Sequence, residues 1–304
     1  MNIAIRVLAL AALLFARVAL GQGLASIDEQ LADEGVAERQ LGDGLYVFYL
    51  PEGGNIVVSI GDQGVLLVDD NFIGSLPTYQ AKIRELGGGD IDFVVNTHWH
   101  YDHTDSNQVL GPQGVWMISQ AHSREMMMHA NTINVVVRPT VNQKAYDTVA
   151  LPMATFDDRM QLHFNDERID LLHFGPAHTT GDAAVIFRGH NVVHLGDVFN
   201  TSGFPFIDAD NGGDLDGVIR FCEGVLAEID EDTLVVPGHG RVAGYAELRS
   251  YVAMLRTVRD RIAALIAQGA TLEEVVDAKT TAEWEEALGD PTRLVDRAYA
   301  SLSR

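Results

Sequence analysis

Four side chains of the kind that bind metal ions fall within six consecutive residues of this chain, HWHYDH at 98–103. They directly follow an apolar run at 91–96 that is typical of a buried strand. Side chains two apart on an extended chain point the same way, so His98 and His100 are expected to face one point. Asp102 and His103 follow the turn and can face a second point nearby. The alternative is a polar loop whose histidines cap the next helix.

A catalytic zinc ion needs three protein ligands and an open position, so the motif needs partners elsewhere in the chain. Three polar residues, His178, Asp197 and His239, each follow an apolar, strand-like run. Sheets of α/β proteins place their chemistry at such strand ends. Taken singly, His178 has an alternative role as a turn cap, Asp197 as a helix N-cap, and His239 as a loop histidine between glycines.

Together, the motif and these three residues resemble the metallo-β-lactamase superfamily of binuclear metallohydrolases in order, in spacing and in strand-end placement. The resemblance covers roughly residues 44–245. It implies a first metal held by His98, His100 and His178, and a second held by Asp102, His103 and His239. It also implies that Asp197 bridges the two metals.

The aspartate at position 197 departs from the best-known secreted β-lactamases of this family, which have a cysteine or no metal ligand there. An aspartate bridge is more typical of the glyoxalase II, lactonase and phosphodiesterase branches. Our first hypothesis is a zinc-dependent hydrolase that opens the amide bond of β-lactam antibiotics by attack of a metal-bridging hydroxide. The second is a lactonase or thioesterase acting on homoserine lactones or glutathione thioesters. A metal-binding protein without turnover is the third.

The resemblance implies two metal ions per chain, and the histidine-rich ligand set favours Zn2+. A site of nitrogen and oxygen ligands with a bridging carboxylate also accepts iron or manganese. Two such ions share a water and lower its pKa, and Asp102 would orient the resulting hydroxide. No cysteine nucleophile is needed. Cys222, the single cysteine, lies in a helical pattern and is expected to be buried.

Residues 1–21 have the pattern of a secretory signal peptide, with Arg6 before a short apolar stretch at 7–15 and small residues at 19–21. This predicts a periplasmic or secreted protein with no stable membrane insertion after cleavage. The alternatives are an uncleaved anchor or an N-terminal core helix. The net charge of −22, from 21 basic and 43 acidic residues, argues against a nucleic-acid partner. The expected partner is a small-molecule substrate.

The order of apolar patterns predicts an α/β protein, a four-layer αβ/βα sandwich in a single domain at 22–304, with a helical C-terminal tail at about 245–304. Expected strands lie at 45–50, 55–60, 65–68, 93–97, 170–174, 183–188, 192–195 and 233–236. Expected helices lie at 76–86, 120–130, 215–229, 245–268 and 271–278.

Other residues are expected to support the site. One of Asp69 and Asp70, which end a strand, is expected to accept a hydrogen bond from a ligand histidine. His194 is expected to be a core or supporting histidine. The long segment 125–156 is a candidate lid whose methionines at 126–128 would line an apolar pocket, with ordinary helix packing as the alternative. Residues 53–55 are a second candidate lid.

A β-lactam carries a carboxylate, so a cation or a group of hydroxyls should face the metals. Lysine is scarce, with only Lys82, Lys144 and Lys279 in the chain. The candidates near the motif residues are Asn200, Thr201, Ser202 and Arg241.

Overall fold

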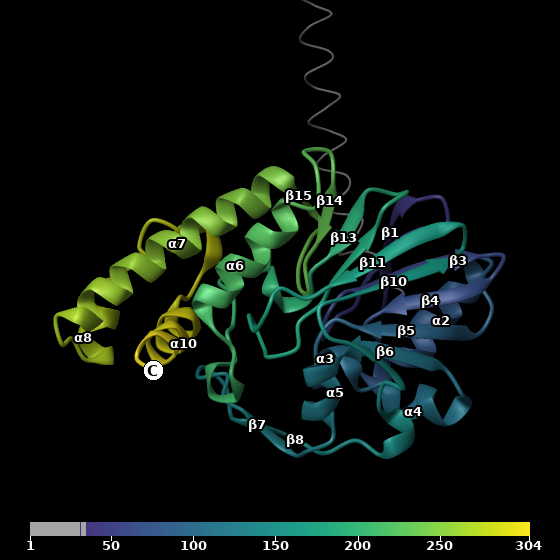
Figure 1. Ribbon diagram of the computed structural model, residues 1–304, viewed down its shortest axis with the longest axis horizontal. Helices are drawn as coiled ribbons and strands as arrows, with labels where there is room; N and C mark the ends of the chain where they lie inside the picture. The colour runs from purple at the N-terminus through teal and green to yellow at the C-terminus, as the bar shows by residue number, and fades with distance from the viewer. Residues whose placement is uncertain (1–30, 32–34) are drawn as a thin grey trace, which may run out of the picture.

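The computed structural model describes residue 31 and residues 35–304, and its strands form two large sheets and one short hairpin (Figure 1). In spatial order, the first sheet consists of β1 (Ala37–Gly42), β2 (Leu45–Tyr49), β3 (Ile56–Gly61), β4 (Gly64–Val68), β5 (Ile91–Asn96), β6 (Trp116–Gln120) and β9 (Ala154–Phe156). The second consists of β10 (Arg159–Phe164), β11 (Glu167–Leu172), β12 (Ala184–Phe187), β13 (Val192–His194), β14 (Leu234–Val236) and β15 (Ala243–Gly244). The hairpin pairs β7 (Asn131–Ile133) with β8 (Val141–Gln143).

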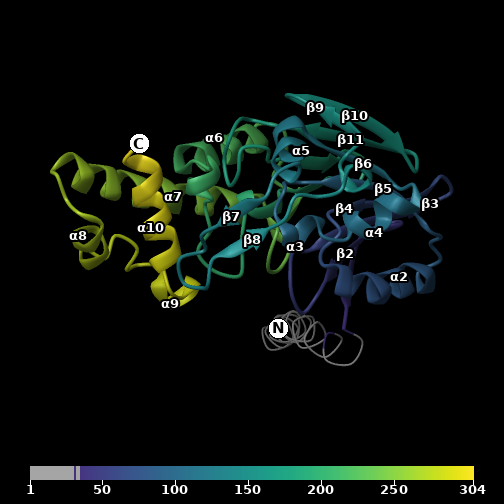
Figure 2. The ribbon, with the colours of Figure 1, turned by 90° about the horizontal axis from the view of Figure 1, so that it is seen from below.

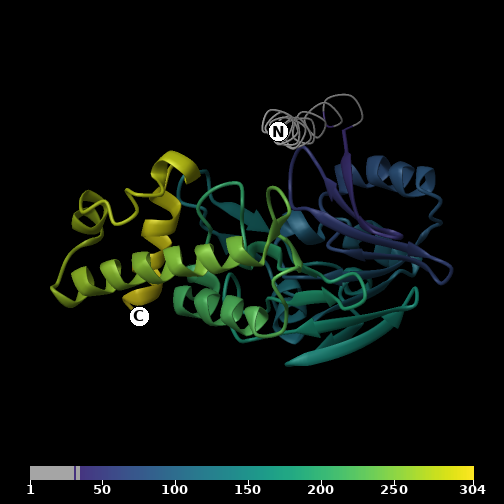
Figure 3. The ribbon, with the colours of Figure 1, turned by 90° about the horizontal axis from the view of Figure 1, so that it is seen from above.

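The helices cover the outer faces of the two sheets and extend beyond them at the C-terminal end. The α-helices are α2 (Leu76–Glu85), α3 (Tyr101–Thr104), α4 (Asn107–Leu110), α5 (Ala121–Met127), α6 (Leu215–Leu226), α7 (Tyr245–Ala267), α8 (Leu272–Asp277), α9 (Glu285–Leu288) and α10 (Thr292–Leu302). Short 3-10 turns are η1 (Ile73–Ser75), η2 (Gly111–Gln113), η3 (Thr148–Ala150), η4 (Gly196–Val198) and η5 (Ala209–Asn211). Figure 3 shows α7, the long yellow-green helix, running beside α6.

The two sheets pack face to face through apolar side chains. Val57 and Val95 of the first sheet and Leu171 and Val185 of the second belong to one buried cluster, and all four are fully buried. Complete burial of such a side chain stabilises the fold by roughly 1.5–3 kcal/mol. On the outer faces, α2 covers the first sheet and α6, α7 and α10 cover the second. The predicted four-layer αβ/βα arrangement and the helical C-terminal region are therefore confirmed.

Local sequence explains where helix α6 starts. Asp214 is the N-cap of α6, and its carboxylate accepts a hydrogen bond from the Gly217 N–H at 3.0 Å. Such a cap satisfies an N–H that the first turn leaves without a partner. The buried face of α6 then includes Val218, Phe221 and Cys222. Cys222 is fully buried, as the sequence predicted.

Parallel strand pairs bring the polar loops to one edge of the sandwich. The pairs β4–β5 and β5–β6 are parallel in the first sheet, and β13–β14 is parallel in the second. Parallel neighbours end on the same side, so the loops after β4 and β5 lie together. The same holds for the loops after β13 and β14. The residue pair Asn200–His239, an isolated parallel bridge, joins these last two loops.

The segment 125–156 is more regular than its sequence indicated. It contains the end of α5, the β7–β8 hairpin, η3 and β9, which joins the first sheet as an edge strand beside β6. Met127 packs into a small apolar cluster with Trp99, and Met128 is exposed. Met126 and Met127 therefore pack beside α5, in line with the alternative of ordinary helix packing. The hairpin that follows them approaches the site.

Among the helices that the structure describes, none combines the length and the apolar character needed to cross a membrane. The predicted signal peptide at 1–21 lies outside the described residues.

Candidate metal centre

The three histidines expected at the first metal position converge although they come from two loops. His98 and His100 follow β5, and His178 lies in the loop between β11 and β12. Their ligand atoms all lie within 4.8 Å of one another, and His178 Nε2 is 2.9 Å from His100 Nδ1. All three side chains are buried. The arrangement presents three imidazole nitrogens to one point.

A second group lies beside the first. Asp102, His103 and His239 also place ligand atoms within 4.8 Å of one another. His239 Nε2 is 3.4 Å from His103 Nε2 and 3.3 Å from Asp102 Oδ2. His103 is fully buried, whereas Asp102 and His239 are partly exposed. This group is therefore the more accessible of the two.

Asp197 lies between the two groups and faces both. Its Oδ1 is 3.2 Å from His103 Nε2 and 3.3 Å from His239 Nε2, both in the second group. Its Oδ2 is 3.7 Å from His178 Nε2, in the first group. A carboxylate whose two oxygens point to separate ligand sets has the geometry needed to link two cations. The structure thus brings together all seven residues singled out in the sequence.

Asp69 fixes the orientation of His103. The Asp69 carboxylate accepts from His103 Nδ1 at 2.8 Å, which leaves Nε2 facing the second group. It also accepts from the Thr97 N–H at 2.7 Å and from the Thr97 hydroxyl at 2.8 Å. Of the two aspartates that the sequence offered as a support for a ligand histidine, the structure therefore selects Asp69. Asp70 is buried too, and burial together with the neighbouring Asp69 raises the pKa of its carboxyl group well above the ordinary value.

Two further supports come from a loop that the sequence did not mark. The Phe206 carbonyl accepts from His178 Nδ1 at 2.8 Å, and Asp208 Oδ2 is 3.0 Å from His100 Nε2. Ligand histidines commonly bind a carboxylate or carbonyl through the second ring nitrogen, which fixes the ring and its tautomer. Neither Phe206 nor Asp208 belongs to a motif, so only the fold reveals them.

His194 is a buried histidine outside the cluster. Its Nδ1 accepts from the Gly196 N–H at 3.3 Å, and the side chain is fully buried. Burial lowers the pKa of His194 to about 4, so the ring is neutral at pH 7. It serves as a core histidine at the end of β13.

The two ligand groups differ in protonation. Burial lowers the pKa of His98 well below its ordinary value and the pKa of His178 to about 4, so both rings are neutral, as ligands must be. Burial lowers the pKa of His239, but the carboxylates of Asp197 and Asp102 outweigh this effect. Together they raise the pKa of that ring to about 10. The carboxylates thus favour positive charge at the second group, and a cation bound there would replace the proton on His239.

One buried atom points directly to a missing partner. His98 Nε2 is buried without a hydrogen-bond partner among the described residues, while the Thr97 hydroxyl lies 3.0 Å from its Nδ1. A buried polar atom without a partner costs on the order of 1–3 kcal/mol. A divalent cation among His98, His100 and His178 satisfies that nitrogen. The residues present therefore fit the metal ions that the fold implies.

Glycine is required where the backbone approaches the ligands. A Cβ at Gly54 would lie 2.2 Å from the His103 ring, and one at Gly238 would lie 2.0 Å from Asp197 Oδ1. Asn55 is also fixed, since its Nδ2 donates to the carbonyls of Pro237 at 3.0 Å and Gly240 at 2.8 Å. Of the candidate lid at 53–55, only Gly53 lines the cavity over the cluster.

That cavity has a volume of about 670 Å³ and is open to solvent above Asp102, Asp197 and His239. Its other lining residues are Pro51, Glu52, Gly53, Phe72, His100, Tyr101, Ile133, Val135, Arg138, Asn200, Ser202, Phe206 and Arg293. Of the groups expected to meet a substrate carboxylate, Asn200 and Ser202 are present. Thr201 instead donates to the Arg241 carbonyl at 2.9 Å, and Arg241 forms an ion pair with Glu247.

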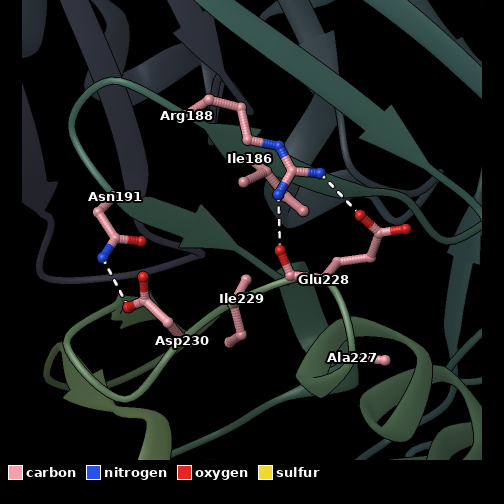
Figure 4. Close-up of a pocket in the computed structure, with 7 residues that line it drawn as sticks. All are labelled: Ile186, Arg188, Asn191, Ala227, Glu228, Ile229 and Asp230. Atoms are coloured by element: carbon pink, nitrogen blue, oxygen red, sulfur yellow. Dashed lines mark hydrogen bonds and ion pairs between the residues drawn. The ribbon is translucent and has the colours of Figure 1, made fainter.

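A second cavity of about 460 Å³ lies near the end of α6. Arg188 enters it from β12 but donates to the backbone and the carboxylate of Glu228, and Asn191 donates to Asp230 (Figure 4). Arg188 and Asn191 are therefore engaged by neighbouring residues of the cavity wall.

Comparison with known proteins agrees with this geometry. The sequence model of the family described as "Metallo-beta-lactamase superfamily" matches residues 51–239. A protein of Methanocaldococcus jannaschii named "Probable metallo-hydrolase" is 23% identical over 191 residues, which is 62% of this chain and 88% of that protein.

Solved structures share the fold at low sequence identity. The metallo-beta-lactamase DIM-1 has a TM-score of 0.60 and 17% identity, over 73% of this chain and 97% of that one. A metallo-beta-lactamase from Pontibacter korlensis has a TM-score of 0.60 and 15% identity, over 73% of this chain and 99% of that one.

Proposed function

The chain belongs to the metallo-beta-lactamase superfamily, and we propose that it uses a binuclear zinc centre to open the amide bond of β-lactams. In this proposal His98, His100 and His178 hold the first ion. Asp102, His103 and His239 would hold the second, and Asp197 would contact both. The observation that carries the proposal is the split orientation of the Asp197 oxygens, one toward each ligand group.

The chain's own residues position the reaction. Bound divalent ions supply Lewis acidity and lower the pKa of water. His103 and His239 hold the pKa of Asp102 at about 2 against the effect of burial, so this side chain is a carboxylate at pH 7. Asp102 faces the cavity and can accept a hydrogen bond from the nucleophilic water, which orients it toward the substrate carbonyl. Asn200 and Ser202 lie on the cavity wall, where they can donate to the substrate.

A β-lactam is our first choice of substrate for two reasons. The cavity of about 670 Å³ suits a compact molecule, since small-molecule sites typically measure about 300–1,000 Å³. We also propose, from residues 1–21, that the protein is exported to the periplasm or the medium. Hydrolysis of β-lactams is useful in those compartments. The structural neighbours support the fold only, because their sequence identities are 15–17%.

A lactonase or thioesterase using the same site is the second candidate. Asp197 favours it, because an aspartate bridge resembles those branches of the family. Export disfavours it, since glutathione thioesters are cytosolic substrates.

Three substrates assayed side by side on the zinc-loaded full chain separate the candidates. We expect turnover of a chromogenic cephalosporin, with weaker or no turnover of a homoserine lactone and of S-lactoylglutathione. Chelator-treated enzyme should lose activity and regain it on addition of zinc. Turnover of the lactone or the thioester without turnover of the cephalosporin would replace the β-lactamase proposal by its alternative. Metal binding without turnover of any of the three would contradict both.

A further inference from the structure

We propose that Arg293, supplied by the C-terminal helix α10, and Arg138, supplied by the β7–β8 hairpin, form a carboxylate-binding wall of the active-site cavity. Both side chains line the cavity that contains Asp102, Asp197 and His239. Arg293 lies outside residues 51–239, the part that matches the family model. The inference rests on the proposed function and names the substrate feature that the site selects, a carboxylate near the reacting carbonyl.

Contacts hold Arg293 close to the first ligand group. Its Nη2 donates to the Phe204 carbonyl at 3.1 Å, and its guanidinium lies 5.8 Å from the centre of the Phe206 ring. The Phe206 ring in turn stacks on His100, with centroids 6.2 Å apart. The Phe206 carbonyl also accepts from His178. One aromatic ring therefore separates the guanidinium from the first group of ligands.

The Arg293 charge is available to a ligand. In the part of the chain that the structure describes, no carboxylate lies within ion-pair distance of Arg293. Arg297, one helical turn further on, pairs with Asp210 at 2.7 Å and Asp296 at 2.5 Å. Asp197 and Asp102 act on Arg293 electrostatically across the cavity, but these are the carboxylates that metal ions would engage. A partly buried guanidinium with open donors is suited to a planar carboxylate, which it binds bidentately.

The hairpin and the helix are tied together, so the two arginines belong to one wall. Asp210 of η5 accepts from Asn134 Nδ2 at 3.2 Å on the hairpin side and pairs with Arg297 on α10. Asn211 Nδ2 also donates to the Thr132 carbonyl at 2.9 Å. Figure 2 shows β7 and β8 lying between α10 and α3, beside the metal-binding motif. Arg138 is exposed on the hairpin and adds positive charge at the mouth of the cavity.

Two thiol probes test this wall without requiring turnover. The probes are 3-mercaptopropionate and its methyl ester, which both bind zinc through a thiol while only the first carries a carboxylate. By calorimetry on the zinc-loaded full chain, we expect the wild type to bind the acid roughly tenfold or more tightly than the ester, the size typical of a charged hydrogen bond. Arg293→Gln should lose most of that preference while its affinity for the ester is unchanged. Arg293→Lys should keep part of it.

Arg249→Gln is the matched control, because it removes the same charge from an exposed position on α7 and should keep the wild-type preference. Thermal unfolding checks that each variant folds. Equal binding of acid and ester by the wild type, or a full preference in folded Arg293→Gln, would overturn the inference and leave the hydrolase proposal standing. If the wild type binds neither thiol, the metal centre and the inference both fail.

Discussion

Asp69 contacts no metal position itself but holds His103, a proposed ligand of the second metal ion. It has a left-handed backbone (φ 62°) directly after β4, and its carboxylate holds both His103 and Thr97. The sequence already indicated an aspartate at this strand end, because the acidic pair directly follows an apolar run. Which member of the pair contacts the histidine depends on backbone direction at the turn, which sequence does not reveal.

Replacing Asp69 with asparagine should weaken the second metal position selectively. Asparagine keeps the size of the side chain but removes the negative charge. That charge orients the His103 ring and makes its Nε2 a more basic ligand. We expect roughly 10- to 100-fold lower affinity for the second zinc ion, as is typical for such supporting residues. Competition with a chromophoric chelator measures both affinities. Asp90→Asn, at an exposed position, should match the wild type. Unchanged zinc affinity in Asp69→Asn would remove the role assigned to this contact.

All seven residues at the cluster could be identified from sequence because each stands at the end of an apolar run or inside one dense motif. Only some of the supporting and lining residues could be, such as Asp69, Asn200 and Ser202. Asp208, Phe206 and Arg293 lie in stretches without periodic or motif signals, and only tertiary packing brings them to the cluster. Of the four candidates for a substrate carboxylate, Thr201 and Arg241 do not line the cavity, and Glu247, six residues after Arg241, engages the Arg241 guanidinium.

At the scale of elements, most apolar runs were predicted, but the buried strand β6 and several edge strands were missed. The expected strands at 45–50 and 192–195 and the helix at 215–229 agree with β2, β13 and α6 to within a few residues. The edge strands β1 and β10 were missed. The β1 sequence AERQLG is mostly polar and gives no strand signal, whereas the β10 sequence RMQLHF alternates polar and apolar residues as a half-buried strand does.

An ion network joins strand β11 to the residues that follow β12 and α6, and it makes the stability of this region sensitive to acid. Asp170 of β11 accepts from Arg168 Nη2 at 2.7 Å and from Arg188 Nε at 2.7 Å, and Arg188 also binds Glu228 after α6 (Figure 4). Arg168 first, and Arg188 with it, hold the pKa of Asp170 well below its ordinary value. The folded protein therefore keeps this carboxylate charged at pH values where the unfolded chain protonates it. Its contribution to stability is present above about pH 4 and is lost as the pH falls further.

Asp170→Asn should consequently lower the free energy of unfolding by about 2 kcal/mol at pH 7. The gap to the wild type should narrow as the pH falls below about 4. Urea unfolding at pH 7 and at successively lower pH measures this difference, with the exposed Asp90→Asn as the control. A gap that stays constant, or grows, as the pH falls would show that the network does not act through the charge of Asp170.

At the scale of the whole molecule, two sheets, a hairpin and a C-terminal helical region each contribute a wall to one cavity. The first sheet supplies the HWHYDH motif, the second supplies His178, Asp197 and His239, and α10 supplies Arg293 (Figure 1). The cavity lining carries Arg138 and Arg293 beside the carboxylates of Glu52, Asp102 and Asp197, in a chain whose net charge is −22. Cations held by Asp102 and Asp197 would offset those two charges and leave the arginines to meet an anionic substrate.

Metal content per chain tests the central claim most directly. Elemental analysis of the purified, zinc-loaded full chain should find two zinc ions per wild-type chain and at most one in Asp197→Ala, with most activity lost. The exposed Asp90→Ala should retain two. A wild-type chain that stays empty under zinc supplementation, or an Asp197→Ala variant that still holds two ions, would contradict the binuclear centre.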